Sequence, residues 1–117
     1  MHEASIAQSI IDQLLEKKAE GIFEGKLTSV HLKIGKLTAI VPDNLIFLYS
    51  VLTEETPLTG SHLEIEMIPV RCQCQKCHLE FEIDELEFWC PECSATNVKV
   101  ITGRELLITA LEVDDAD

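Results

Sequence analysis

The five cysteines of this 117-residue sequence all lie between Cys72 and Cys93, and their spacing predicts a metal site. Four of them form two C-x-x-C pairs, Cys74 with Cys77 and Cys90 with Cys93, and twelve residues separate the pairs. A tight turn within each pair directs both sulfurs toward one point, and two such turns supply the four thiolates of a tetrahedral Zn(II) site. Four thiolates leave no open position for water, so we predict a structural zinc ion and not a catalytic one.

Other interpretations of the cysteines stay open at this stage. Buried thiols or a disulfide would account for some of them, although an odd number cannot pair completely within one chain. A rubredoxin-like iron centre also uses two such pairs, but Gly usually follows each pair there, whereas His78 and Ser94 hold those places here. Cys72 could replace Cys74 as a ligand. His78 could also act as a ligand beside Cys77, although such a residue is more often simply exposed.

The first three residues, Met1, His2 and Glu3, form a second group that could bind a metal. His2 is too large for ready removal of Met1, so we expect a free α-amine at residue 1. That amine, the following amide nitrogen and the His2 imidazole form adjacent chelate rings in one plane, which the amide or carboxylate of Glu3 could complete. This square geometry suits Ni(II) or Cu(II) and does not suit zinc. Taken alone the signal is weak, because a His at position 2 usually belongs to a disordered end.

The charge of the sequence argues against several classes of partner. Nine basic and twenty-one acidic residues give a formal net charge of -12. A nucleic-acid backbone would be repelled by such a surface, and the basic residues form no compensating cluster, so we expect no nucleic-acid partner. We find neither a stretch of roughly 20 apolar residues nor a signal peptide, so we expect no membrane association. We therefore expect a cytoplasmic protein, in a reducing compartment that favours metal binding by cysteines.

Apolar periodicity predicts the elements that must position these groups. Residues 4–20 have the spacing of an amphipathic helix, and residues 29–35 alternate like a strand with one buried face. A second helix is predicted over 42–55, and we expect it to be largely buried because apolar residues surround most of its circumference. Further strands are predicted over 62–67, ending near Pro69, and over 106–113.

The order of these elements predicts a core with an insertion. A last strand rich in Leu and Ile cannot bury both faces within a small zinc loop, so we expect it to return to the sheet formed by the earlier strands. The predicted fold is α+β or α/β, with two helices packed on a small three-stranded sheet and an inserted zinc-ribbon-like domain with four cysteine ligands. We expect residues 1–70 and 104–117 to form an α/β core domain and residues 71–103 to form the inserted zinc-binding domain.

Two smaller expectations concern side chains near these elements. A hairpin between the two cysteine pairs could place a small apolar cluster over the metal, formed by Leu79, Phe81, Ile83 and Leu86. His31 and His62 occupy polar positions of the predicted strands. We therefore expect both to face solvent, and we assign them no role.

Taken together, the motifs resemble those of the hydrogenase nickel-incorporation proteins of the HypA/HybF family. The start Met1-His2-Glu3 is followed at once by an Ile-rich amphipathic helix and a V-x-L-x-I-G strand, and the chain continues to C-x-C-x-x-C and C-P-x-C. The resemblance covers essentially the whole chain. It implies a two-part protein that acts in the maturation of [NiFe]-hydrogenase and has no catalytic residues.

The resemblance also implies the metals and partners. Ni(II), as transient cargo, would be held by His2, with the Met1 amine and Glu3 alongside, and structural Zn(II) by the four paired cysteines. The implied partners are the maturation GTPase of the nickel-insertion pathway and the [NiFe]-hydrogenase large-subunit precursor. Some members that also serve urease carry a His after each cysteine pair. Here Ser94 replaces the second of these, so the resemblance does not extend to that feature.

Two alternatives to nickel delivery follow from the residues themselves. A zinc-ribbon protein-interaction module would bind one zinc and would not respond to replacement of His2. An electron-transfer iron protein would be coloured. An enzyme is the least favoured class, because the sequence lacks a Ser/His/Asp order, a phosphate-binding Gly loop and an open metal site.

Overall fold

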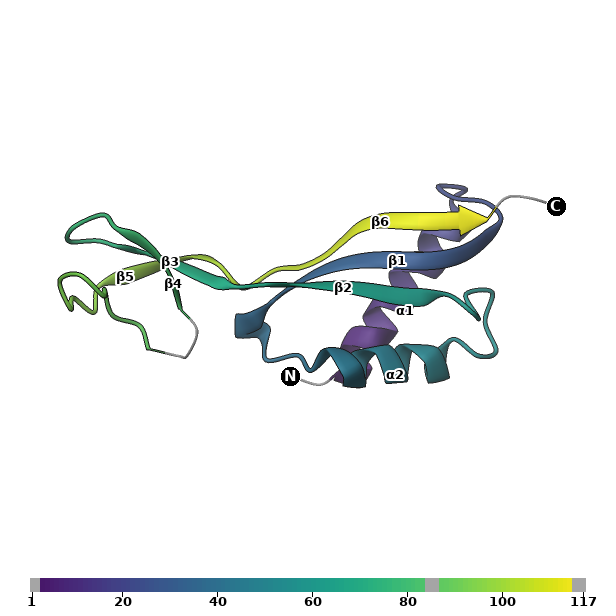
Figure 1. Ribbon diagram of the computed structural model, residues 1–117. Coiled ribbons are helices and arrows are strands. Elements are labelled where there is room, and N and C mark those ends of the chain that lie inside the picture. Colours follow the sequence, from purple (N-terminus) through teal and green to yellow (C-terminus); the bar gives the residue numbers. More distant parts are fainter. Residues whose placement is uncertain (1–2, 84–86, 115–117) are drawn as a thin grey trace.

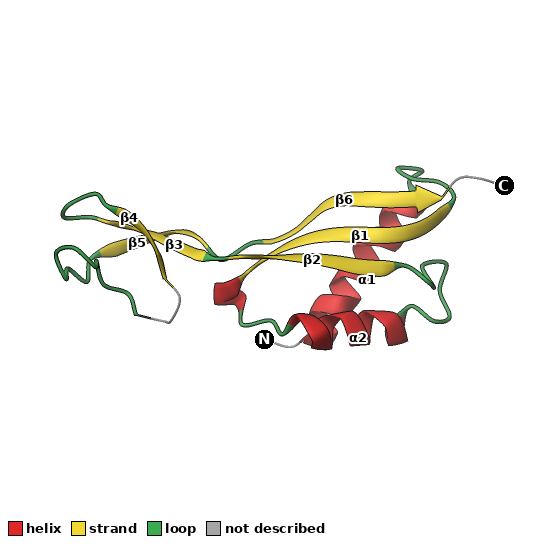
Figure 2. Cartoon of the chain, in the orientation of Figure 1, coloured by secondary structure: helices red, strands yellow, loops and turns green. Residues whose placement is uncertain are grey.

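The computed structural model describes residues 3–83 and 87–114, and it consists of two small sheets placed end to end (Figure 1). Both α-helices pack against the first of these sheets (Figure 2). The elements, in chain order, are α1 (Glu3–Ala19), β1 (Lys26–Gly35), the short 3-10 helix η1 (Lys36–Thr38), α2 (Pro42–Leu52), β2 (His62–Ile68), β3 (Val70–Cys74), β4 (Glu80–Ile83), β5 (Val98–Thr102) and β6 (Leu106–Asp114).

The first sheet has the strand order β2-β1-β6. β1 pairs in parallel with β2, and the chain between them passes through α2, as a parallel connection requires a long crossover. β6 pairs antiparallel with β1. The last strand therefore returns to the sheet of the first strand, as predicted, and Val30, Leu32 and Ile34 of β1 are buried in the core beneath the helices.

Helix α1 is amphipathic, as predicted, and buries Ala7, Ile10, Ile11 and Leu14. The helix predicted over 42–55 is observed as α2, but the expectation that it would be largely buried was wrong. Of its residues only Leu45 and Tyr49 are buried, whereas Phe47 is 64% exposed and Val51 is 44% exposed. α2 covers one side of a thin structure and has a partner on one face only, so its remaining apolar residues face solvent.

The second sheet has the order β4-β3-β5, with both pairings antiparallel. Its small core is formed around Val70, Cys72 and Ile83, with Phe81 packed against them. The predicted apolar cluster therefore differs from the observed one: Phe81 and Ile83 pack around Cys72 and not over the cysteine pairs. Leu86 lies outside the described residues.

The two sheets meet where β1 ends and β6 begins. The Gly35 amide donates a hydrogen bond to the Glu105 carbonyl at 2.8 Å, and the Leu37 amide donates one to the Gly103 carbonyl at 2.8 Å. Leu37 of η1 also packs against the core of the second sheet. A Cβ atom on Gly35 would lie 2.0 Å from the carbonyl carbon and oxygen of Gly103, so this junction requires glycine at residue 35.

The fold agrees with the predicted class, which combines two helices on a three-stranded sheet with an inserted cysteine-bearing part. The molecule is elongated, with extents of 59 × 23 × 19 Å. No helix in the described part of the chain is long and apolar enough to cross a membrane.

Candidate metal centre

The first cysteine pair is held in a tight turn that begins at the last residue of β3. The Cys74 amide donates to the Leu79 carbonyl at 2.9 Å, and the His78 amide donates to the Cys74 carbonyl at 2.9 Å. Inside this turn the Cys74 sulfur accepts hydrogen bonds from the amides of Lys76 at 3.3 Å and Cys77 at 3.4 Å. The backbone therefore directs positive dipole ends at this sulfur.

The second pair repeats the same turn. The Cys90 amide donates to the Ala95 carbonyl at 2.9 Å, and the Ser94 amide donates to the Cys90 carbonyl at 2.9 Å. The residue after each pair has a left-handed backbone, with φ of 65° at His78 and 61° at Ser94. Side chains are disfavoured there by roughly 1 to 2 kcal/mol, so both turns hold a conformation that glycine would adopt more readily.

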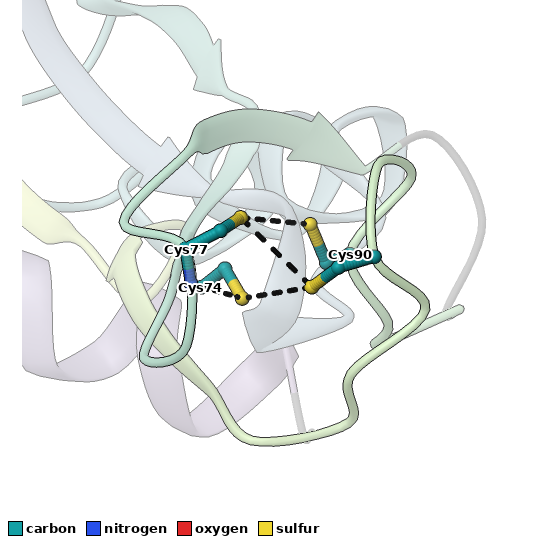
Figure 3. Close-up of side chains that lie close together, drawn as sticks. Cys74, Cys77 and Cys90 are labelled. Atoms are coloured by element: carbon teal, nitrogen blue, oxygen red, sulfur yellow. Dashed lines mark hydrogen bonds between the residues drawn. The ribbon is translucent and has the colours of Figure 1, made fainter.

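The four sulfurs of these two turns face one another (Figure 3). The Cys74 and Cys93 sulfurs are 3.6 Å apart, the Cys77 and Cys90 sulfurs are 3.6 Å apart, and the Cys93 and Cys77 sulfurs are 3.9 Å apart. Four sulfurs at the Zn–S distance of about 2.3 Å in a tetrahedron would be about 3.8 Å apart. The cluster therefore has the size of a tetrahedral four-thiolate site.

Electrostatics in the cluster require a cation for full ionisation. Hydrogen bonds from the Cys77 and Lys76 amides lower the pKa of Cys74 to about 6. The Leu79 amide also lowers the pKa of Cys77, but burial and the neighbouring thiols outweigh it and raise that pKa to about 12. The Cys74 sulfur thus ionises readily, whereas the Cys77 sulfur keeps its proton. A bound divalent cation would favour the thiolate form of all four cysteines and release the remaining protons.

Cys72 and His78 do not join this cluster. Cys72 is fully buried in the core of the second sheet, and burial raises its pKa. Of the two alternatives left open by the sequence, Cys74 and not Cys72 lies with the other three sulfurs. Among the described residues, the four cysteines are the only group of three or more potential ligands whose ligand atoms lie within 4.8 Å of one another. His78 is exposed outside it.

Of the predicted nickel ligands, only Glu3 belongs to the described residues, and Met1 and His2 lie outside them. Glu3 begins α1, and its carboxylate accepts a hydrogen bond from the Val41 amide at 3.2 Å. Val41 is the N-cap residue directly before α2. Residue 3 is therefore tied to the start of α2, a contact that no local pattern in the sequence could predict because the partners are distant along the chain.

Comparison with known proteins agrees with this architecture. The sequence model of the family described as "Hydrogenase/urease nickel incorporation, metallochaperone, hypA" matches residues 1–113. A relative named "Hydrogenase maturation factor HypA", from Desulfatibacillum aliphaticivorans, is 37% identical over 117 residues, covering 100% of this chain and 90% of the relative.

Two solved structures are also similar. The solution structure of the Ni metallochaperone HypA from Helicobacter pylori matches with a TM-score of 0.66 and 27% identity, over 97% of both chains. A second, described as the solution structure of HypA protein, matches with a TM-score of 0.70 and 26% identity, over 99% of this chain and 98% of the other. Sequence and fold agree over nearly the whole length, and the chain therefore belongs to the HypA family.

Proposed function

We propose that this chain is a nickel metallochaperone that binds Ni(II) at its N-terminus and delivers it during maturation of [NiFe]-hydrogenase, while a structural zinc ion holds its second sheet. The observation that carries the proposal is the family match over residues 1–113, which includes both the N-terminal triplet and all four paired cysteines. The protein would act by carrying a metal and not by catalysis.

The zinc ion would be bound by Cys74, Cys77, Cys90 and Cys93. The sulfur separations of 3.6 to 3.9 Å support this assignment, because they suit tetrahedral thiolate coordination. The second sheet has only a small apolar core, so a metal would supply much of its stability. This supports the division into a nickel-binding domain, residues 1–70 and 104–117, and a zinc-binding domain, residues 71–103.

Nickel would be bound by the Met1 amine, the amide nitrogen of residue 2 and the His2 imidazole, with Glu3 alongside. The hydrogen bond between the Glu3 carboxylate and the Val41 amide supports a positioning role for that side chain. The carboxylate already has a partner, so the fourth donor in the plane would more readily be the Glu3 amide nitrogen. A few nitrogen donors at a chain end can release the ion to a thiolate-bearing acceptor by ligand exchange.

The recipients would be those implied by the family, a maturation GTPase of the nickel-insertion pathway and the large-subunit precursor of [NiFe]-hydrogenase. The net charge of -12 supports a partner with a basic surface, whose rate of association would fall as salt is added. All of these steps would take place in the cytoplasm, where the cysteines stay reduced.

The experiment is a nickel titration by calorimetry of zinc-loaded, untagged protein beside two variants, His2→Ala and a chain with extra N-terminal residues. Delivery predicts one tight Ni(II) per wild-type chain and loss of tight binding in both variants. Retention of tight binding in both variants, or its absence from the wild type, would instead favour an interaction module that carries only zinc. Glu3→Gln, which keeps the side-chain acceptor for the Val41 amide, serves as the matched control and should still bind nickel tightly.

A further inference from the structure

The face of the first sheet that points away from the helices carries an unexpected group of metal-binding side chains. Ser29 lies in the central strand, with His62 as its neighbour on β2 and Glu112 as its neighbour on β6. His31 is the next residue of β1 on the same face, because side chains two apart along a strand point the same way. Two imidazoles and a carboxylate, one from each strand, therefore surround the small side chain of Ser29.

Part of this arrangement is already assembled. The Nε2 atom of His31 lies 2.6 Å from a carboxylate oxygen of Glu112. Two neighbouring ligand atoms about 2.1 Å from one octahedral ion lie about 3.0 Å apart, so an ion that replaces the proton between them would widen this pair by a few tenths of an ångström. The group is open to solvent, with 37% of the His31 side chain and 61% of the Glu112 side chain exposed, so a hydrated ion can reach it.

The third ligand would come from the edge of the sheet. His62 is exposed at the start of β2, at the position that pairs with Ser29 of β1. The His62 ring must turn to complete the site. In the described part of the chain, the four cysteines are the only group of three or more ligands whose atoms already lie within 4.8 Å of one another. Glu64, which pairs with His31, adds a second carboxylate beside the site.

We infer that His31, His62 and Glu112 form a second, weaker site for a first-row divalent ion such as Ni(II), above Ser29. Two imidazoles and one carboxylate facing an open position form a donor set that such ions accept with water completing the shell. The acidic charge of the protein favours a cation there. Two lysines of β1 flank the group: Lys33 lies opposite Glu66 on β2, and Lys26 lies opposite Asp114 on β6, with its Nζ atom near Gly60. The site is separate from the N-terminus and does not depend on the proposed nickel delivery.

The two sites would differ in the electronic state of nickel. A square of nitrogen donors makes Ni(II) diamagnetic, whereas imidazole, carboxylate and water ligands leave it six-coordinate and paramagnetic. Paramagnetic nickel broadens the NMR signals of nearby nuclei. The test is therefore a titration of the zinc-loaded His2→Ala protein with a nickel salt, followed by amide NMR spectra.

We expect broadening centred on Ser29 and its neighbours in β2 and β6, with affinity weakened about ten-fold or more by His31→Ala or by His62→Ala. His78→Ala, which removes an exposed histidine far along the chain, and Glu66→Gln, on the same face of β2, should leave the broadening unchanged. Because His62 lies exposed on an edge strand, its replacement tests the site even if His31→Ala disturbs the sheet. Broadening centred elsewhere, broadening that survives His62→Ala, or none at all would overturn the inference. Failure of the N-terminal site would show only in the calorimetric comparison.

Discussion

At the scale of single residues, Gly35 and Gly103 determine how closely the two sheets can meet. Gly35 has an ordinary extended backbone, with φ of -75°, so its side chain is excluded by space and not by conformation. Gly21 presents the opposite case. Its φ is 77°, and nothing lies within 4 Å of the position where a Cβ would stand.

This contrast leads to a prediction for two alanine variants. Gly35→Ala should lower the free energy of unfolding by about 3 kcal/mol or more, because the new Cβ would overlap the Gly103 backbone. Gly21→Ala should cost only about 1 to 2 kcal/mol, the penalty of a left-handed alanine. Denaturant titration monitored by circular dichroism measures both. Equal, small losses would mean that the junction can open to admit a methyl group at no further cost.

Cys72 and Cys74 are two residues apart in the same strand but have different surroundings. Cys72→Ala should keep one zinc per chain and lose about 1 kcal/mol of stability from its apolar cluster. Cys74→Ala should lose the zinc, because that sulfur belongs to the four-sulfur group. Metal analysis of the purified variants measures the stoichiometry. If only Cys72→Ala lost the zinc, then Cys72 and not Cys74 would be the zinc ligand.

At the scale of elements, the sequence predicted what depends on local pattern and missed what depends on neighbours. The two C-x-x-C turns follow from spacing, and α1 follows from its single apolar stripe. The exposure of α2 could not be predicted in this way, because the sequence of a helix that is apolar nearly all round does not show how many of its faces pack against the rest of the protein. The contact of Glu3 with Val41 depends on how α1 packs beside α2, and that of His31 with Glu112 depends on strand order and register; periodicity leaves both undetermined.

The exposure of α2 can be tested within one helix. Leu45→Ala should lower the free energy of unfolding by about 2 to 5 kcal/mol, since this side chain is fully buried. Phe47→Ala should change it by about 0.5 kcal/mol or less, although it removes a larger side chain, because that side chain is 64% exposed. Chemical denaturation gives both values. A loss of several kcal/mol from Phe47→Ala would mean that this face of α2 is covered in solution, for example by a second copy.

At the scale of the whole molecule, shape distinguishes this chain from an ordinary domain of its length. Its radius of gyration over Cα atoms is 17.9 Å, whereas a compact chain of 117 residues would have about 13 Å. The difference arises because the second sheet continues beyond the end of the first and does not fold back on it (Figure 1). The four-cysteine cluster therefore lies at one end of the molecule, beyond the junction of Gly35 with Gly103.

Small-angle X-ray scattering of the zinc-loaded monomer tests whether the junction keeps this shape. Backbone hydrogen bonds of 2.8 Å to the carbonyls of Gly103 and Glu105, together with Leu37 packed on the second core, should hold the two sheets extended. We expect a measured radius of gyration close to 17.9 Å, slightly raised by the hydration layer. A value near that of a compact chain would mean that the second sheet folds back along the first. Gly35→Ala gives the matched comparison, because loosening the junction should broaden the distribution of distances while both sheets stay folded.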